Sequence, residues 1–77
     1  MEKILLPELG EGIEEAQICH WYYNEGERVK KSADLVEVST DKATFNIPAP
    51  LNGTLKSIKV PVGENVKVGN ILAEIEE

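Results

Sequence analysis

Few side chains in this sequence have the type and spacing that catalysis requires. Cys19 and His20 are adjacent, but a metal site needs three or four convergent ligands, and the chain has one cysteine and one histidine. The acidic pair Glu14 and Glu15 has no partner acid or base at a fixed spacing, and no Ser/His/Asp arrangement is present. We therefore expect no catalysis by this chain alone.

Lys42 is the remaining candidate, because an exposed amine can receive a covalent group. It stands between Asp41 and Ala43, without the apolar surroundings that would make the amine a nucleophile in its own right. The simpler interpretation is a solvated charge that discourages edge pairing of a strand. The choice between the two depends on the element that carries the lysine.

The elements around Lys42 are predicted to be short strands. No window of a dozen residues has apolar side chains at helical spacing, and Gly or Pro interrupts nearly every stretch. The predicted strands span residues 3–7, 18–23, 28–29, 35–40, 43–47, 54–60, 65–67 and 71–75. This pattern predicts an all-β fold.

Lys42 lies at the tip of a hairpin in this pattern. With residues 41 and 42 as the turn, the pairs are Thr40 with Ala43, Ser39 with Thr44, Val38 with Phe45, Glu37 with Asn46 and Val36 with Ile47. The large apolar partners then share one face, and a slip of one residue would bury the polar partners instead. The turn type stays open, because Asp-Lys is not the favoured Asn-Gly kind of two-residue turn.

The chain also contains an internal repeat. Residues 26–38 and 63–75 align without a gap at an offset of 37, with six identical positions in thirteen. Trp21 and Tyr23 fall on apolar residues at the same offset, so we expect them in the core. The apolar spacing there predicts one bulge or bend in each half. Residues 3–7 match 44–48 at an offset of 41, which predicts four extra residues within Glu8 to Glu15.

Two similar halves cannot each bury an apolar face alone. We therefore predict a flattened barrel-sandwich hybrid of two four-stranded sheets with internal pseudo-two-fold symmetry. Residues 71–75 should pair with 3–7, which places both termini at the end away from Lys42. Function is expected where the symmetry breaks, at the Lys42 hairpin and at the insertion.

Composition excludes several classes of function. A chain of 77 residues holds one small domain. Eight basic and fourteen acidic side chains give a net charge of -6, which disfavours binding to nucleic acid and to anionic membranes. No apolar run approaches the roughly 18 residues of a membrane span. One cysteine allows no internal disulfide, so we expect a cytoplasmic location, or the mitochondrial matrix in a eukaryote.

Short motifs extend along the whole chain. They are Leu6 to Ile13 (LPELGEGI), Trp21 to Glu27 ahead of Val29, Leu35 to Val38 (LVEV), Thr40 to Ala43 (TDKA), Ile47 to Pro50 (IPAP), Gly53, Val62 to Glu64 and Val68 to Gly69. Together they resemble the lipoyl domain of the dihydrolipoamide acyltransferases in 2-oxo acid dehydrogenase complexes. Asp41-Lys42-Ala43 is the most specific motif, because it falls where the register places the turn. Ser39 departs from the family pattern, in which a glutamate is usual, and makes the tip less acidic.

The resemblance implies that Lys42 carries lipoate in amide linkage, as a swinging arm attached by a lipoate ligase or lipoyl transferase. The arm would take an acyl group from a thiamin-dependent 2-oxo acid decarboxylase, deliver it to the acyltransferase core and be reoxidised by dihydrolipoamide dehydrogenase. Thr40, Asp41 and Ala43 would form the recognised turn. Tethering makes encounters between these active sites intramolecular.

The resemblance also gives a role to the acidic loop, which is otherwise a flexible solvated segment. Its residues Gly10, Glu11, Gly12, Ile13, Glu14 and Glu15 would help the decarboxylase recognise its own carrier. The loop and tip motifs favour a pyruvate or branched-chain complex over a 2-oxoglutarate complex. Residues 1–77 would be the N-terminal lipoyl domain of a longer acyltransferase, monomeric when isolated, and the transferase activity would belong to the rest of that protein.

Two other functions compete with this one. A biotin carrier domain resembles the same fold and is also modified on a hairpin lysine, but it flanks that lysine with methionines, and the only methionine here is Met1. An unmodified sandwich domain used only for protein contacts is the third possibility. The intact tip and the acidic loop argue against it.

Overall fold

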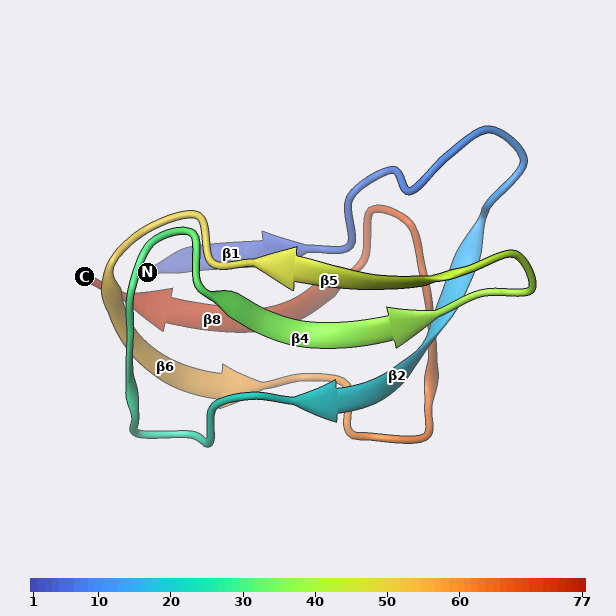
Figure 1. The fold of residues 1–77 in the computed structure, drawn as a ribbon. Helices are drawn as coiled ribbons and strands as arrows, with labels where there is room; N and C mark the ends of the chain where they lie inside the picture. The colour runs from blue at the N-terminus through green and yellow to red at the C-terminus, as the bar shows by residue number, and fades with distance from the viewer.

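The computed structural model describes residues 1–77 and is built of strands and connecting turns (Figure 1). The strands are β1 (Glu2–Leu5), β2 (Glu15–Trp21), β3 (Arg28–Val29), β4 (Asp34–Ser39), β5 (Thr44–Pro48), β6 (Gly53–Ile58), β7 (Asn65–Lys67) and β8 (Ile71–Glu76). The all-β prediction is confirmed, and the predicted strand ends differ from the observed ones by three residues at most. The structure has no helix that is long and apolar enough to cross a membrane.

The strands form two antiparallel sheets of four strands each. One sheet has the order β1-β8-β6-β3 and the other the order β5-β4-β2-β7. Each strand of one sheet corresponds to the strand four places along the chain in the other, so the two orders are related by a pseudo-two-fold axis. The sheets pack face to face as a flattened, open barrel (Figure 1), which confirms the predicted architecture.

The repeat is also present in the backbone hydrogen bonds. Ile18 N donates to Glu64 O at 2.9 Å, and its counterpart Leu55 N donates to Glu27 O at 2.8 Å. The register shifts where β1 pairs with β8 and where β4 pairs with β5. It also shifts where the apolar spacing predicted an irregularity, in β2 after Ile18 and in β6 after Leu55. These positions are 37 residues apart, so the predicted bulge in each half is confirmed.

The predicted alignment of the first strand was wrong by two residues. Ile4 pairs with Ala73, and Ile47 pairs with Val36, which is the repeat counterpart of Ala73. Ile4 therefore corresponds to Ile47, an offset of 43, and 43 minus 37 gives six extra residues in the first half instead of four. A shift of two residues keeps every side chain on the same face of a strand, so the apolar pattern cannot distinguish the two alignments.

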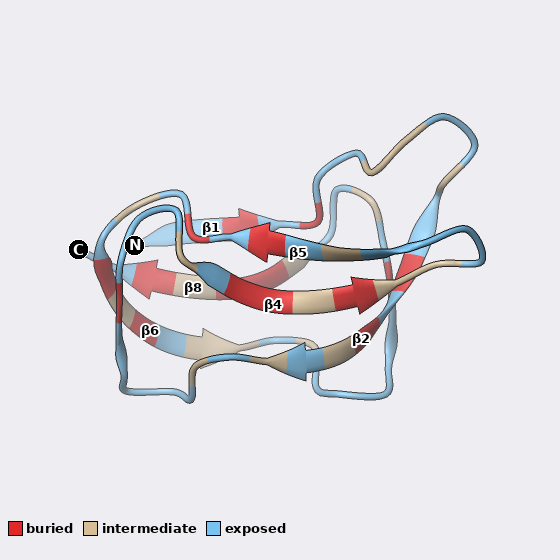
Figure 2. Ribbon diagram, in the orientation of Figure 1, coloured by how far each residue is buried: buried red, intermediate tan, exposed pale blue.

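The core lies between the sheets and consists of 15 buried apolar residues. Figure 2 shows buried positions in the middle of the strands, whereas the loops are largely exposed. Trp21 and Tyr23, which we expected in the core, are half-buried and pack against its edge. The indole explains this placement for Trp21, because its Nε1 donates to Val60 O at 2.9 Å and needs that acceptor.

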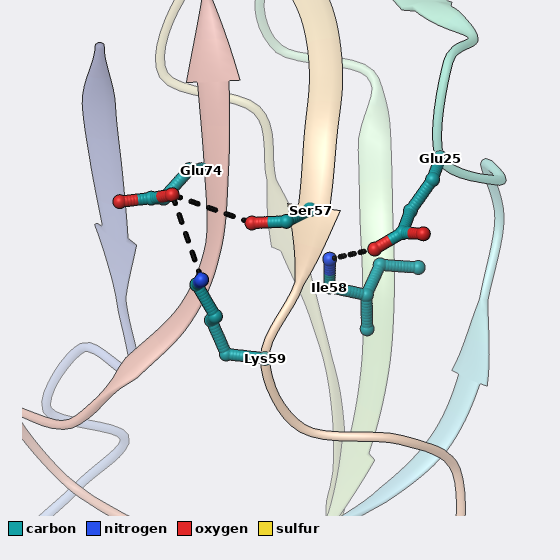
Figure 3. Close-up of polar contacts among 5 residues, drawn as sticks. All are labelled: Glu25, Ser57, Ile58, Lys59 and Glu74. Atoms are coloured by element: carbon teal, nitrogen blue, oxygen red, sulfur yellow. Dashed lines mark hydrogen bonds and ion pairs between the residues drawn. The ribbon is translucent and has the colours of Figure 1, made fainter.

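Close backbone packing and polar contacts hold the β1-β8-β6-β3 sheet together. Gly53 is buried, and a Cβ atom there would lie 2.6 Å from Glu76 O on β8. Glu74 accepts a hydrogen bond from Ser57 Oγ at 3.3 Å and pairs with Lys59 Nζ at 3.7 Å (Figure 3). Figure 3 also shows Glu25, which accepts from Ile58 N at 2.7 Å and so satisfies the amide that follows the β6 bulge.

Candidate functional site

The β4–β5 hairpin presents Lys42 at one end of the molecule. The observed pairs include Ser39 with Thr44, Val38 with Phe45 and Val36 with Ile47, as predicted. Val36, Val38 and Ile47 are buried, and this burial fixes the register. Both termini lie at the opposite end of the fold (Figure 1), so the predicted separation of the termini from Lys42 is confirmed.

The turn at Asp41 and Lys42 is closed by a backbone hydrogen bond from Thr40 N to Ala43 O at 2.8 Å and by the Thr40 side chain. Thr40 Oγ1 accepts hydrogen bonds from Lys42 N at 3.2 Å and from Ala43 N at 3.1 Å, and it donates to Ala43 O at 3.0 Å. Ser32 is the only non-glycine residue with a positive φ, so both turn residues have negative φ. This excludes the I′ and II′ turns that are usual in two-residue hairpins and settles part of the question that the sequence left open.

An open cleft of about 1180 Å³ separates the tip from the insertion. Of its 15 lining residues only three are hydrophobic, so the cleft is polar. Thr40, Asp41 and Lys42 line one side, and the segment from Gly10 to Glu15 lines the other, except for Glu11. Ala43, the remaining predicted recognition residue, lies outside the cleft.

The side chain of Lys42 is exposed and is not held by a carboxylate. It takes part in neither of the two ion pairs of the structure, which are Lys56–Glu76 and Lys59–Glu74 on the β1-β8-β6-β3 sheet. Its Nζ lies beside the insertion, 3.6 Å from the position that a Cβ atom at Gly12 would occupy. The amine is therefore free to react, and Gly12 beside it has no side chain.

Sequence reasoning missed part of the cleft. Gln17, Asn65 and Lys67 also line it, and they come from β2 and β7. These strands are paired, with Glu15 opposite Lys67, so the floor of the cleft is built from both halves of the chain. The pairing of β3 with β6 is the equivalent arrangement in the repeat, and no local sequence pattern predicted either pairing.

The other chemically interesting side chains lie away from this cleft. Cys19 is a half-buried free thiol, and the His20 ring meets the Tyr22 ring edge-on with centroids 4.8 Å apart. Loss of hydration raises the pKa of Tyr22 above its usual value, and the carboxylates of Glu37 and Asp34 raise this pKa further. The Tyr22 hydroxyl donates to Asn46 Oδ1 at 3.1 Å. Cys19 and His20 are thus packing and surface residues, as expected.

Comparison with known proteins gives a consistent set of relatives. The chain is 45% identical over 75 residues to the dihydrolipoyllysine-residue succinyltransferase component of the 2-oxoglutarate dehydrogenase complex of Rickettsia conorii, covering 97% of this chain and 19% of that protein. It is 35% identical over 77 residues to the dihydrolipoyllysine-residue acetyltransferase component of the pyruvate dehydrogenase complex of Acholeplasma laidlawii, covering 100% of this chain and 14% of that protein. The chain thus spans about a fifth or less of the length of these curated relatives.

Solved structures show the same fold. The lipoyl domain of the 2-oxoglutarate dehydrogenase complex from Azotobacter vinelandii matches with a TM-score of 0.80 and 27% identity, over 100% of this chain and 98% of that one. Urea carboxylase of Kluyveromyces lactis contains a similar fold, with a TM-score of 0.77 and 17% identity over 99% of this chain and 6% of that one. The family model Biotin_lipoyl, described as "Biotin-requiring enzyme", matches residues 2–75. This chain therefore belongs to the family of biotin- and lipoyl-attachment domains, as its motifs predicted.

Proposed function

We propose that this chain is a lipoyl carrier domain with lipoate attached through an amide bond to Lys42. The observation that carries the proposal is the placement of Lys42, which is exposed, free of ion pairs and located at the tip of the β4–β5 hairpin. The identity to dihydrolipoyllysine-containing acyltransferase components supports lipoate over biotin. The absence of a flanking methionine supports the same choice.

The residues present suit such a group. Lys42 Nζ would hold the carboxyl end of lipoate, and the open polar cleft beside the tip leaves the arm unobstructed. Bound lipoate supplies a cyclic disulfide that accepts acyl groups and electrons. The protein supplies position, because a chain that continues from the termini would leave at the end opposite Lys42 (Figure 1).

The proposed setting is a 2-oxo acid dehydrogenase complex. The chain would be the N-terminal lipoyl domain of a longer dihydrolipoamide acyltransferase, in the cytoplasm or mitochondrial matrix. It would serve a thiamin-dependent decarboxylase, the acyltransferase core and dihydrolipoamide dehydrogenase, with residues 10–15 contributing to recognition by the decarboxylase. The relatives include both 2-oxoglutarate and pyruvate types, so the preference for a pyruvate or branched-chain complex stays a prediction.

Selective modification tests the proposal. The domain is incubated with a lipoate ligase, ATP and lipoate, and its intact mass is measured beside Lys42→Arg and Lys67→Arg variants. Lys67 is the matched control, because it lines the same cleft but stands in a strand instead of at a turn. We expect one lipoyl group on the wild type and on Lys67→Arg, and none on Lys42→Arg.

Two outcomes would contradict the proposal. Equal labelling of Lys42→Arg would show that the tip lysine is not the attachment site. Labelling of the wild type by a biotin ligase, together with no labelling by the lipoate ligase, would favour the biotin carrier. If the lipoylated domain is made, its reductive acylation by decarboxylases for pyruvate, branched-chain 2-oxo acids and 2-oxoglutarate then identifies the complex.

A further inference from the structure

The tip of the hairpin solves a conformational problem in an unusual way. Two-residue hairpin loops generally need positive φ at one or both turn residues, which favours Gly or Asn. Asp41 and Lys42 both have negative φ instead. A backbone hydrogen bond from Thr40 N to Ala43 O at 2.8 Å joins the strand ends, but the amides of Lys42 and Ala43 within the turn need another acceptor.

The Thr40 hydroxyl is that acceptor. A hydroxyl has one proton to donate and two lone pairs to accept with, and all three are used here. Its oxygen accepts from the amides of Lys42 at 3.2 Å and Ala43 at 3.1 Å, and its proton goes to Ala43 O at 3.0 Å. The side chain of Thr40 thus occupies the inside of the turn, where it satisfies the amide of Lys42.

The backbone of the turn is what directs the Lys42 side chain, since that side chain takes part in no ion pair. We infer that the Thr40 hydroxyl is a positioning group for the modification of Lys42, an inference that rests on the proposed function. It fixes the tip in the conformation from which the attaching enzyme takes the amine. Thr40 itself does not react.

The reaction served by this geometry is an acyl transfer. The neutral Lys42 Nζ attacks the carboxyl carbon of a lipoyl adenylate, which a ligase makes from ATP and lipoate. The N–C bond forms, the C–O bond to the phosphate breaks, AMP leaves with the electron pair, and the surplus proton on nitrogen passes to a base or to water. Such a step is sensitive to displacement of the amine by about 1 Å, which costs on the order of a hundredfold in rate.

The test compares Thr40→Val, Thr40→Ser and Thr44→Val in steady-state lipoylation with a lipoate ligase, ATP and lipoate. Valine preserves the shape of threonine without the hydroxyl, and serine preserves the hydroxyl. Thr44 is an exposed threonine of the same hairpin, at the first position of β5, and serves as the matched control. We expect Thr40→Val to lower kcat/KM about tenfold through kcat, and the other two variants to stay within about threefold of wild type.

A second readout does not depend on the enzyme. The amide ¹H and ¹⁵N chemical shifts of Lys42 and Ala43 should move in Thr40→Val and stay near the wild-type values in Thr40→Ser. If Thr40→Val does not fold, the less drastic Thr40→Ala is used with the same controls.

Several results would overturn the inference. These are wild-type kcat/KM in Thr40→Val, an equal loss in Thr44→Val, or no recovery in Thr40→Ser. A change confined to KM would also overturn it, because it would indicate direct contact between the hydroxyl and the enzyme. Failure of the wild type itself to be lipoylated would overturn the proposed function, and the inference with it, so the two failures are distinguishable.

Discussion

The substitutions Ser32→Gly and Gly69→Ser should change the free energy of unfolding in opposite directions. The two residues are repeat counterparts, 37 positions apart, and both have positive φ, 74° at Ser32 and 92° at Gly69. Their backbone amides make equivalent hydrogen bonds, Ser32 N to Ala49 O at 2.8 Å and Gly69 N to Leu6 O at 2.9 Å. The fold thus requires the same left-handed conformation twice, and only one position has the residue that adopts it without strain.

The magnitude follows from two opposing terms. A left-handed conformation costs a non-glycine residue about 1–2 kcal/mol, and glycine loses about 0.4–1 kcal/mol more chain entropy on folding. No heavy atom lies within 4 Å of a Cβ atom placed on Gly69, so a steric term is absent there. Ser32→Gly should therefore raise the free energy of unfolding by about 1 kcal/mol, and Gly69→Ser should lower it by about 1 kcal/mol.

Urea unfolding and thermal unfolding, both followed by the fluorescence of Trp21, the only tryptophan, measure the two changes in stability. We expect unchanged m-values, thermal midpoints displaced by about 4–8 °C in opposite directions, and a double variant close to wild type. A loss of stability in Ser32→Gly would refute the reasoning, because it would mean that the serine side chain contributes more than its strain costs.

Four other substitutions test three further predictions. Gly53→Ala should lower the free energy of unfolding by about 1–3 kcal/mol in urea titrations, because its methyl group would meet the β8 backbone at 2.6 Å; wild-type stability would contradict this close approach of β6 to β8. Gly12→Ala and Gly63→Ala, at φ +81° and +94°, should each lower the free energy of unfolding by about 1 kcal/mol. Only Gly12→Ala should slow lipoylation, since its methyl group would lie 3.6 Å from Lys42 Nζ. Equal lipoylation rates in the two variants would exclude this effect. The raised pKa of Tyr22 means that the unfolded chain releases the phenolic proton first as the pH rises. The stabilisation is therefore complete below about pH 10 and is lost as the pH rises through the folded pKa, so the urea midpoint should fall less between pH 9 and pH 11 in Tyr22→Phe than in wild type.

The hairpin shows how much of the site could be predicted. Val36, Val38 and Ile47 alternate with polar residues, and only one register buries all three, so the position of Lys42 followed from the sequence. The conformation of the turn did not follow from the sequence, because the Thr40 hydroxyl, instead of a backbone carbonyl, accepts the hydrogen bond from Ala43 N. Thr40 was singled out through the family resemblance, and the structure showed what its side chain contacts.

The insertion shows the limit of the same reasoning. Its location between the first two strands was predicted, but its length was not, because a two-residue shift of β1 leaves the apolar face unchanged. Lys67 was not connected with Lys42 for a related reason, since the two residues are brought together by the pairing of β7 with β2 and not by any local pattern.

The sequence by itself thus determined the two-fold repeat, the bulge in each half and the lysine at the tip, because each is encoded in the alternation and spacing of nearby apolar residues. Only the tertiary structure decided the six-residue insertion, the polar cleft and the closeness of Gly12 to the Lys42 amine. Those features depend on how strands that are distant in the chain pack and pair. The alternation of apolar residues shows which face of a strand a side chain occupies, but not which distant strand lies beside it.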